Sequence, residues 1–174
     1  MSRFPLGSVE QQGKAYTLDF EREYPFSAET IWAALTRPEL TAQWWAEAEI
    51  DLRVGEVFRL RWLNSKDGEA QHWTGGEITA LEPLQLLEHT NSDHGMLRWH
   101  LEERDGSTVL TLTNVVTPPE RRFVTMSLAG WHVHLDHLQE ALEGGTIDWP
   151  NWYPDYESAW AELREIYADI NGLP

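Results

Sequence analysis

Apolar and polar residues alternate near the start of the chain, and this pattern predicts a β-strand over residues 15–24. Ser27 follows as a natural N-cap, and apolar residues then recur at helical spacing, so a short helix is expected after it. Pro38 ends that helix and fits the first turn of a second one, which closes at Trp44 and Trp45. The first part of the chain is therefore predicted to contain one strand followed by two small helices.

Between residues 48 and 116 the hydrophobic period stays at two, and turn residues interrupt it at short intervals. This pattern is typical of consecutive antiparallel strands joined by tight turns. Six strands are predicted there: one on each side of Gly55, then residues 70–82, 84–91, 96–103 and 108–116. A turn is expected at residues 64–68, and the pair Gly75–Gly76 predicts a bend within its strand.

A second helical region follows the last strand. Thr117, two prolines and Glu120 form a capping-box pattern at which a helix could begin, and Gly130 could divide that helix into a short and a long piece. The pair Gly144–Gly145 ends the long piece. Its apolar stripe consists of Trp131, His134, Leu135, Leu138 and Leu142. A final helix is predicted from a second stripe, formed by Tyr156, Trp160, Leu163, Tyr167 and Ile170.

Several short motifs occur in an order that resembles a known family. They are Phe26–Trp32 (FSAETIW), Trp44–Trp45, Gly55–Phe58 (GEVF), Gly76–Pro83 (GEITALEP), and Gly130–Trp131 with Leu135 and Leu138. With them the chain resembles the SRPBCC domains of START-like helix-grip fold, and among these the chaperone-ATPase-activator-homologue family. The resemblance covers residues 15–143 and implies an α+β fold. A curved seven-stranded antiparallel sheet would wrap around a long C-terminal helix, with two small helices after the first strand and an extra C-terminal helix.

The expected organisation is a loose segment over residues 1–14, one helix-grip domain over 15–145, and an aromatic connector with an amphipathic helix over 146–174. The last segment departs from the family pattern and is interpreted as a subfamily extension. Its apolar stripe needs a partner surface, either on its own domain or on a second copy in a homodimer. Docking on its own domain is the expectation.

Composition narrows the classes of function. A net charge of −16 with only 13 Lys and Arg argues against binding to nucleic-acid backbones or anionic membranes. The absence of cysteine excludes disulfides and thiolate chemistry. The first residues lack the apolar run of a signal peptide, and no stretch approaches the roughly 20 apolar residues of a spanning helix, so a cytoplasmic protein without membrane insertion is expected. Ten tryptophans indicate a large core, a lined cavity, or both.

The resemblance implies three functions. Members of the superfamily bind lipids, polyketides or other small apolar ligands, so binding of a small apolar or aromatic ligand between the sheet and the long helix is the first hypothesis. A cyclase- or hydrolase-like enzyme that uses a cavity histidine is an alternative. A module that binds a chaperone, like the ATPase activators, is another. The chain has no recognisable catalytic or phosphate-binding motif, and no cofactor is expected.

The expected cavity is lined by the inner faces of the sheet and of the long helix. The candidate lining residues are Phe58, Leu60, Trp62, Trp73, His89, Asn91, Trp99, Asn114, Trp131, His134 and Leu138. A shift of the strand register by one residue would turn His89, Asn91 and Asn114 outward. The bend at Gly75–Gly76 leaves open which face of the strand Trp73 occupies. As the alternative, these large side chains simply fill the space. Arg59 and Arg61 alternate with the inner residues and should point outward.

Three histidines on the long helix suggest two kinds of chemistry. His132 lies about 200° around the helix from His134, so His132, His134 and His137 cannot converge on one metal ion, and none is expected. His134 shares the face of Trp131 and should look into the cavity, where it could orient a polar ligand group or act as a general base. The alternative is a histidine satisfied by one buried hydrogen bond.

Overall fold

The structure, a computed structural model, describes residues 4–66 and 71–174. The described strands are β1 (Ser8–Gln12), β2 (Ala15–Tyr24), β3 (Ala46–Ile50), β4 (Val57–Trp62), β5 (Thr74–Glu82), β6 (Leu86–Asn91), β7 (Gly95–Arg104) and β8 (Ser107–Val116). They form one antiparallel sheet in the order β1-β2-β8-β7-β6-β5-β4-β3. The helices are α1 (Ala28–Thr36), α2 (Pro38–Thr41), α3 (Arg122–Leu142), the 3₁₀ turn η1 (Trp149–Asn151) and α4 (Trp152–Asn171).

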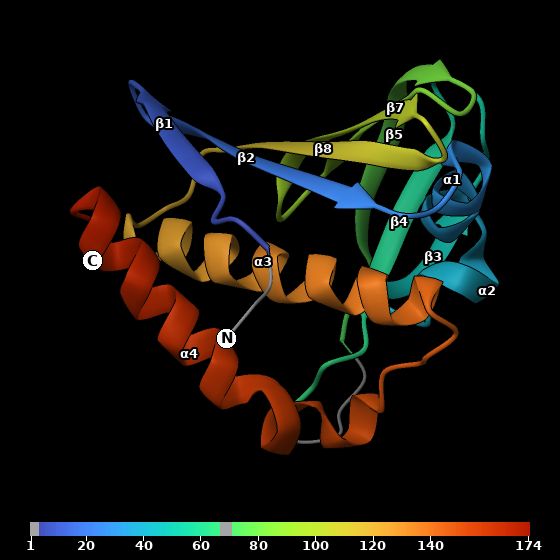
Figure 1. Ribbon diagram of the computed structural model, residues 1–174. Coiled ribbons are helices and arrows are strands. Elements are labelled where there is room, and N and C mark those ends of the chain that lie inside the picture. The colour runs from blue at the N-terminus through green and yellow to red at the C-terminus, as the bar shows by residue number, and fades with distance from the viewer. Residues whose placement is uncertain (1–3, 67–70) are drawn as a thin grey trace.

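The long helix α3 crosses the concave side of the sheet, and α4 lies against α3 on the side away from the strands (Figure 1). This arrangement confirms the α+β helix-grip architecture. The order of one long strand, two small helices, six strands and a long helix is the predicted order. None of the described helices combines the length and the apolar character needed to span a bilayer.

The described sheet has eight strands, one more than predicted. The additional strand, β1, pairs with β2 around a turn at Gly13, which has a φ of 63°. Its sequence, SVEQQ, is mostly polar and mostly exposed, so no hydrophobic alternation marks it as a strand. The turn expected at residues 64–68 and the strand start expected at residue 70 fall partly outside the described residues.

The first helices form as their capping residues predict. Ser27 Oγ accepts a hydrogen bond from the backbone N–H of Thr30 at 3.2 Å, and Pro38 occupies the first turn of α2. Trp44 and Trp45, which follow α2, are fully buried. The indole N–H of Trp44 donates to the backbone carbonyl of Ala34 at 3.0 Å, which attaches the end of α2 to α1.

The start of α3 corrects the predicted capping box. The helix begins at Arg122, and no side chain caps it. Pro118 and Pro119 each disfavour helical backbone in the residue before them, so Thr117 and Pro118 remain extended beyond β8. Gly130 does not divide the helix, which runs uninterrupted to Leu142. A glycine costs a helix only about 1 kcal/mol relative to alanine, and the packing of α3 outweighs that cost.

The last helix docks on its own domain, as predicted. Tyr167 is fully buried, and its hydroxyl lies 2.8 Å from His132 Nδ1 on α3. The same hydroxyl accepts a hydrogen bond from the backbone N–H of Gly7 at 2.8 Å, so one side chain joins α4, α3 and the N-terminal segment. Ile170 is the exception in the stripe, because it is 57% exposed.

The alternation of inner and outer residues in the sheet follows the predicted register. His89, Asn91 and Asn114 are buried on the inner face. Arg59 and Arg61 point outward from β4, and each is hydrogen-bonded to a glutamate of β3 across the pair. The polar inner residues are therefore part of the space between the sheet and α3.

Candidate functional site

The space under the middle of the sheet is filled by aromatic rings. The ring of Trp99 lies 5.0 Å from that of Trp45 and 5.7 Å from that of Trp131, measured between centroids. His89 stacks on Phe58 at 3.8 Å and accepts a hydrogen bond from the indole N–H of Trp99 at 3.2 Å. Leu60 and Leu138 are also buried in this core. In this region the rings fill the space between the sheet and α3, which is the alternative to a ligand cavity.

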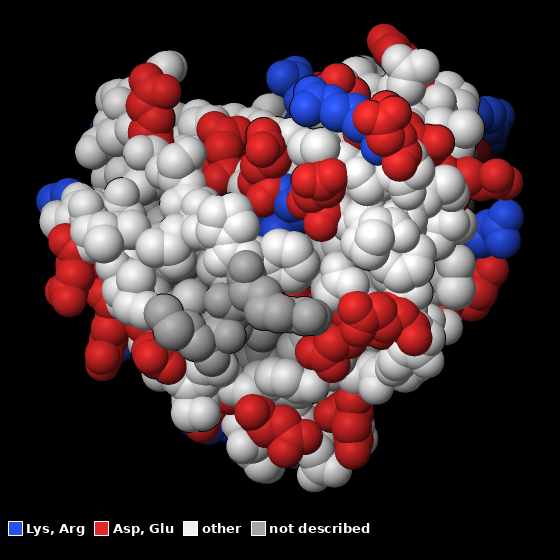
Figure 2. Space-filling model, in the orientation of Figure 1, with Lys and Arg blue, Asp and Glu red and all other residues white. Residues whose placement is uncertain are grey.

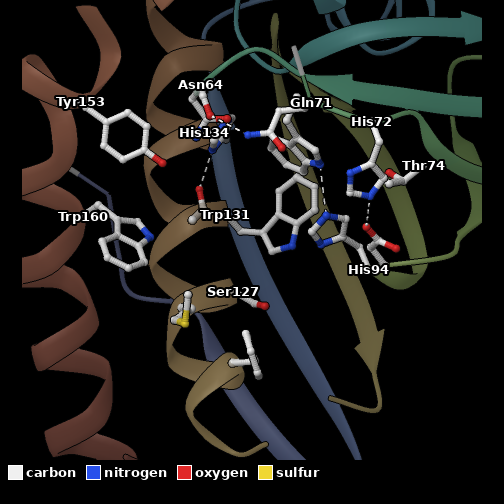
Figure 3. Close-up of a pocket in the computed structure, with 15 residues that line it drawn as sticks. Asn64, Gln71, His72, Thr74, His94, Ser127, Trp131, His134, Tyr153 and Trp160 are labelled. Atoms are coloured by element: carbon white, nitrogen blue, oxygen red, sulfur yellow. Dashed lines mark hydrogen bonds and ion pairs between the residues drawn. The ribbon is translucent and has the colours of Figure 1, made fainter. Parts of the chain in front are cut away.

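A groove of about 440 Å³ lies at one end of this packed region (Figure 3). It opens where β4 ends, where β6 turns into β7, and where the first half of α3 faces α4. Its lining residues are Trp62, Asn64, Gln71, His72, Thr74, Asp93, His94, Phe123, Met126, Ser127, Gly130, Trp131, His134, Tyr153 and Trp160. Large aromatic walls with a few polar groups are typical of small-molecule sites.

Of the predicted lining residues, Trp62, Trp131 and His134 meet in this groove. Trp73 does not line it. Its side chain is 37% exposed, and the guanidinium groups of Arg59 and Arg61 lie 5.2 and 5.3 Å from its ring centroid on the outer side of β4. The correction has a simple cause: Trp73 precedes β5, so the alternation of that strand does not govern it.

Two asparagines hold the wall that the β6–β7 turn contributes. Asn91 Oδ1 accepts hydrogen bonds from the backbone N–H groups of Asp93 and His94, at 2.9 and 3.0 Å. Asn114 Nδ2 donates to the carbonyl oxygens of His94 and Met96, at 2.7 and 2.9 Å. Both asparagines thus support the turn beside the groove, which is a structural role for two of the predicted lining residues.

The tryptophan walls are oriented by hydrogen bonds at their indole nitrogens. Trp131 donates its indole N–H to Asn114 Oδ1 at 3.0 Å. Trp62 donates to His94 Nε2 at 3.1 Å. Because an indole N–H can only donate, His94 Nε2 carries no proton in this bond. Burial also lowers the pKa of His94, so the neutral ring, with its proton on Nδ1, is the favoured form.

His134 is held by its own helix. Its Nδ1 lies 2.9 Å from the backbone oxygen of Gly130, which can only accept, so the proton is on Nδ1 and Nε2 has a free lone pair. That Nε2 is sealed from solvent and has no hydrogen-bond partner among the described residues. Burial lowers the pKa of His134 to about 4, so the ring is neutral near pH 7. The ring is a wall of the groove, and its lone pair lies behind that wall.

The extension after residue 145 completes the groove. Tyr153 and Trp160 come from α4 and extend toward α3, the helix that carries Trp131 (Figure 3). Gly130 also lies on α3, where a Cβ atom would have Trp160 Nε1, at 4.0 Å, as its nearest neighbour. The segment interpreted as a subfamily extension therefore supplies one side of the candidate site.

The electrostatic character of the groove is neutral to acidic. No lysine or arginine is among its described lining residues. The carboxylate of Asp93 lies 3.2 Å from His72 Nε2 at the rim. Acidic side chains are also widespread over the visible face of the molecule (Figure 2), in keeping with the net charge of −16. Two cations lie close to lining rings: Lys66 Nζ is 5.5 Å from the ring centroid of Tyr153, and the guanidinium group of Arg164 is 5.5 Å from that of Trp160.

The other buried histidines lie outside the groove. His137 accepts a hydrogen bond from the indole N–H of Trp152 at 3.0 Å, and burial lowers its pKa to about 3. Burial likewise lowers the pKa of His132 to about 4 and that of His89 to about 3. Among the described residues, no cluster of three or more His, Asp or Glu is arranged to hold a metal ion.

Sequence reasoning missed most of the polar lining. His94, His72 and Asp93 belong to turns or irregular segments, where no periodicity predicts the direction of a side chain. Trp160 was assigned only to an amphipathic stripe. One signal in the sequence could have indicated this wall. Two polar residues, Asn91 and Asn114, are expected on the inner face of the sheet, and Asn91 begins the turn predicted over residues 91–95.

The chain shares its fold with known proteins. The model of the family described as "Activator of Hsp90 ATPase homolog 1-like protein" matches residues 25–143. The crystal structure of CalU16 from Micromonospora echinospora aligns with a TM-score of 0.68 and 20% identity, over 94% of each chain. A protein from Rhodobacter sphaeroides aligns with a TM-score of 0.65 and 23% identity, over 79% of this chain and 98% of that one. DynU16, a protein in the dynemicin biosynthetic locus, aligns with a TM-score of 0.62 and 21% identity, over 75% of this chain and 48% of that one. No curated protein matches.

Proposed function

The chain belongs to the Activator of Hsp90 ATPase homolog 1-like family, and from this premise we propose that it binds a small aromatic or apolar molecule in the groove between β4, the β6–β7 turn, α3 and α4. The observation that carries the proposal is the groove itself. Its volume of about 440 Å³ suits a ligand of two or three fused rings, and three tryptophans form its walls.

The indole N–H groups offer a direct test. The ten tryptophans should give ten side-chain signals in a nitrogen–proton NMR spectrum. Addition of 1-tetralone, a neutral two-ring probe, should shift the signals of Trp62, Trp131 and Trp160. The signals of Trp44 and Trp99, which lie in the packed region, should stay in place.

A matched pair of variants tests the same proposal by affinity. Ser127 lines the groove and is half-buried, so Ser127→Phe should fill it and weaken 1-tetralone binding more than tenfold. Ser158, on the exposed side of α4, provides the control, and Ser158→Phe should bind normally. Isothermal titration measures both. Absence of any titratable binding to the unmodified chain, or an equal effect of the two variants, would remove the proposal.

A further inference from the structure

The groove presents a hydrogen-bond donor that has no acceptor. Trp160 Nε1 makes no hydrogen bond within the described residues, and it is not among the polar atoms sealed from solvent. Its N–H is directed into the groove toward α3 (Figure 3). Since an indole N–H cannot accept, only an acceptor atom satisfies it.

A second donor belongs to His94, which lines another wall of the groove. His94 Nε2 accepts the hydrogen bond of Trp62, so the neutral ring carries its proton on Nδ1. Nδ1 has no partner among the described residues and, unlike His134 Nε2, is not sealed from solvent. Trp160 and His94 therefore place N–H groups on two walls of the groove, whose other polar lining side chains include Asn64, Gln71 and Ser127. The lone pair of His134 Nε2 lies behind the surface.

Gly130 gives an independent indication. Within a 21-residue helix a glycine costs about 1 kcal/mol relative to alanine. No close packing requires it, because a Cβ atom would meet nothing nearer than Trp160 Nε1 at 4.0 Å. An alanine would fit the fold. The absence of a Cβ atom leaves the room of about one methyl group immediately beside the N–H of Trp160.

From these three observations we infer that the groove selects a neutral planar ligand that bears carbonyl oxygens, one of which enters the space over Gly130 and accepts a hydrogen bond from Trp160. A second acceptor at the far edge of the ligand binds His94 Nδ1. Neutrality is inferred from the lining, which contains Asp93 but no described lysine or arginine. The nearby cations, Arg164 and Lys66, lie against the rings of Trp160 and Tyr153 and are not part of that lining. The inference rests on the proposed function, since it describes the ligand of the same groove.

The experiment uses two probes that share one skeleton and differ in one carbonyl, 1-tetralone and tetralin. The full-length chain should bind 1-tetralone about five- to tenfold more tightly than tetralin, the effect of one neutral hydrogen bond. Trp160→Phe keeps an aromatic wall and removes the N–H, so it should abolish this preference and bring the ratio of the two affinities close to one. Trp73→Phe, at the outer face, is the matched control and should retain the preference.

A variant at Gly130 tests the space beside the N–H. Gly130→Ala should weaken 1-tetralone binding at least fivefold while the chain unfolds at an equal or higher urea concentration, which separates ligand binding from folding. Equal affinities of the two probes for the unmodified chain would overturn the inference and leave the proposed function in place. Failure of both probes to bind would remove both. Retention of the preference in Trp160→Phe would also overturn the inference.

Discussion

Two tryptophan–histidine pairs occupy different regions of this protein and make the same hydrogen bond. In the packed region Trp99 donates to His89 Nε2 at 3.2 Å, and in the groove Trp62 donates to His94 Nε2 at 3.1 Å. Each histidine is neutral for the same reason, since burial lowers both pKa values. The residue types and the chemistry are alike, but the surroundings differ.

The difference lies in the second nitrogen of each ring. His89 Nδ1 is sealed from solvent inside the core, while His94 Nδ1 is not sealed. A ligand can therefore reach one ring and not the other. The comparison teaches that access, rather than the kind of residue, distinguishes the groove from the core in this fold.

The largest expected difference between the two regions is in stability, when the donor tryptophan of each pair is replaced by alanine. Trp99→Ala should lower the free energy of unfolding by about 3–5 kcal/mol, because it empties a fully buried site among rigid rings. Trp62→Ala should cost only about 1–2 kcal/mol, because that ring is half-buried beside open space. Urea unfolding followed by circular dichroism measures both. Equal losses would mean that the two regions are packed alike.

Asn114 joins the two regions, so its replacement tests their coupling. Its side chain holds Trp131 on one side and the carbonyl groups of the β6–β7 turn on the other. Asn114→Ala should lower the free energy of unfolding by about 2–3 kcal/mol, because buried partners lose their hydrogen bonds. It should also shift the indole N–H signal of Trp62, since the turn that carries His94 loses support. Thr113→Ala, one residue away on the outer face, is the control, and an equal loss there would contradict the coupling.

The buried histidines predict how stability depends on pH. Their folded pKa values, about 3 to 4, lie below the ordinary 6.5, so the unfolded chain binds protons that the folded chain does not. The stability that they contribute is present above pH 6.5 and is lost as the pH falls toward 4. Each histidine should contribute a slope of about 1.4 kcal/mol per pH unit in that window.

His89 and Leu87, two buried residues of β6, serve as a matched pair for this slope. His89→Gln removes one titrating group, so it should reduce the slope of the free energy of unfolding between pH 6.5 and 5 by about 1.4 kcal/mol per pH unit. Leu87→Ala lowers the free energy of unfolding without removing a titrating group, so it should leave the slope unchanged. Urea titrations at several pH values measure the slope, and identical slopes in both variants would refute the assignment of the effect to the histidine.

Much of the fold could be predicted because its signals are local. The period of two placed His89, Asn91 and Asn114 on the inner face, and all three are buried there. Strand β1 and the start of α3 could not be predicted in this way. Strand β1 has no alternation of apolar residues. The segment before α3 carries a capping pattern, but its two successive prolines disfavour helical backbone, and the helix begins after them.

The candidate site was predicted only in part. Trp62, Trp131 and His134 were identified because they belong to a strand and a helix with clear periods. His94 lies in a turn, and its direction depends on hydrogen bonds from Asn91 and Asn114, which are distant in sequence from each other. Trp160 reaches the groove only because α4 folds back over α3.

The sequence by itself determined the order of strands and helices, the faces that are buried, and the neutral-to-acidic character of the chain, because each follows from spacing or composition. Only the tertiary structure decided which part of the aromatic interior is closed and which is open. Ring packing depends on distances between residues far apart in the chain. Tryptophan and histidine side chains therefore fill the core at one end and leave a groove at the other. Trp160 and His94, which are far apart in the chain, line the same groove only because the ring packing stops there.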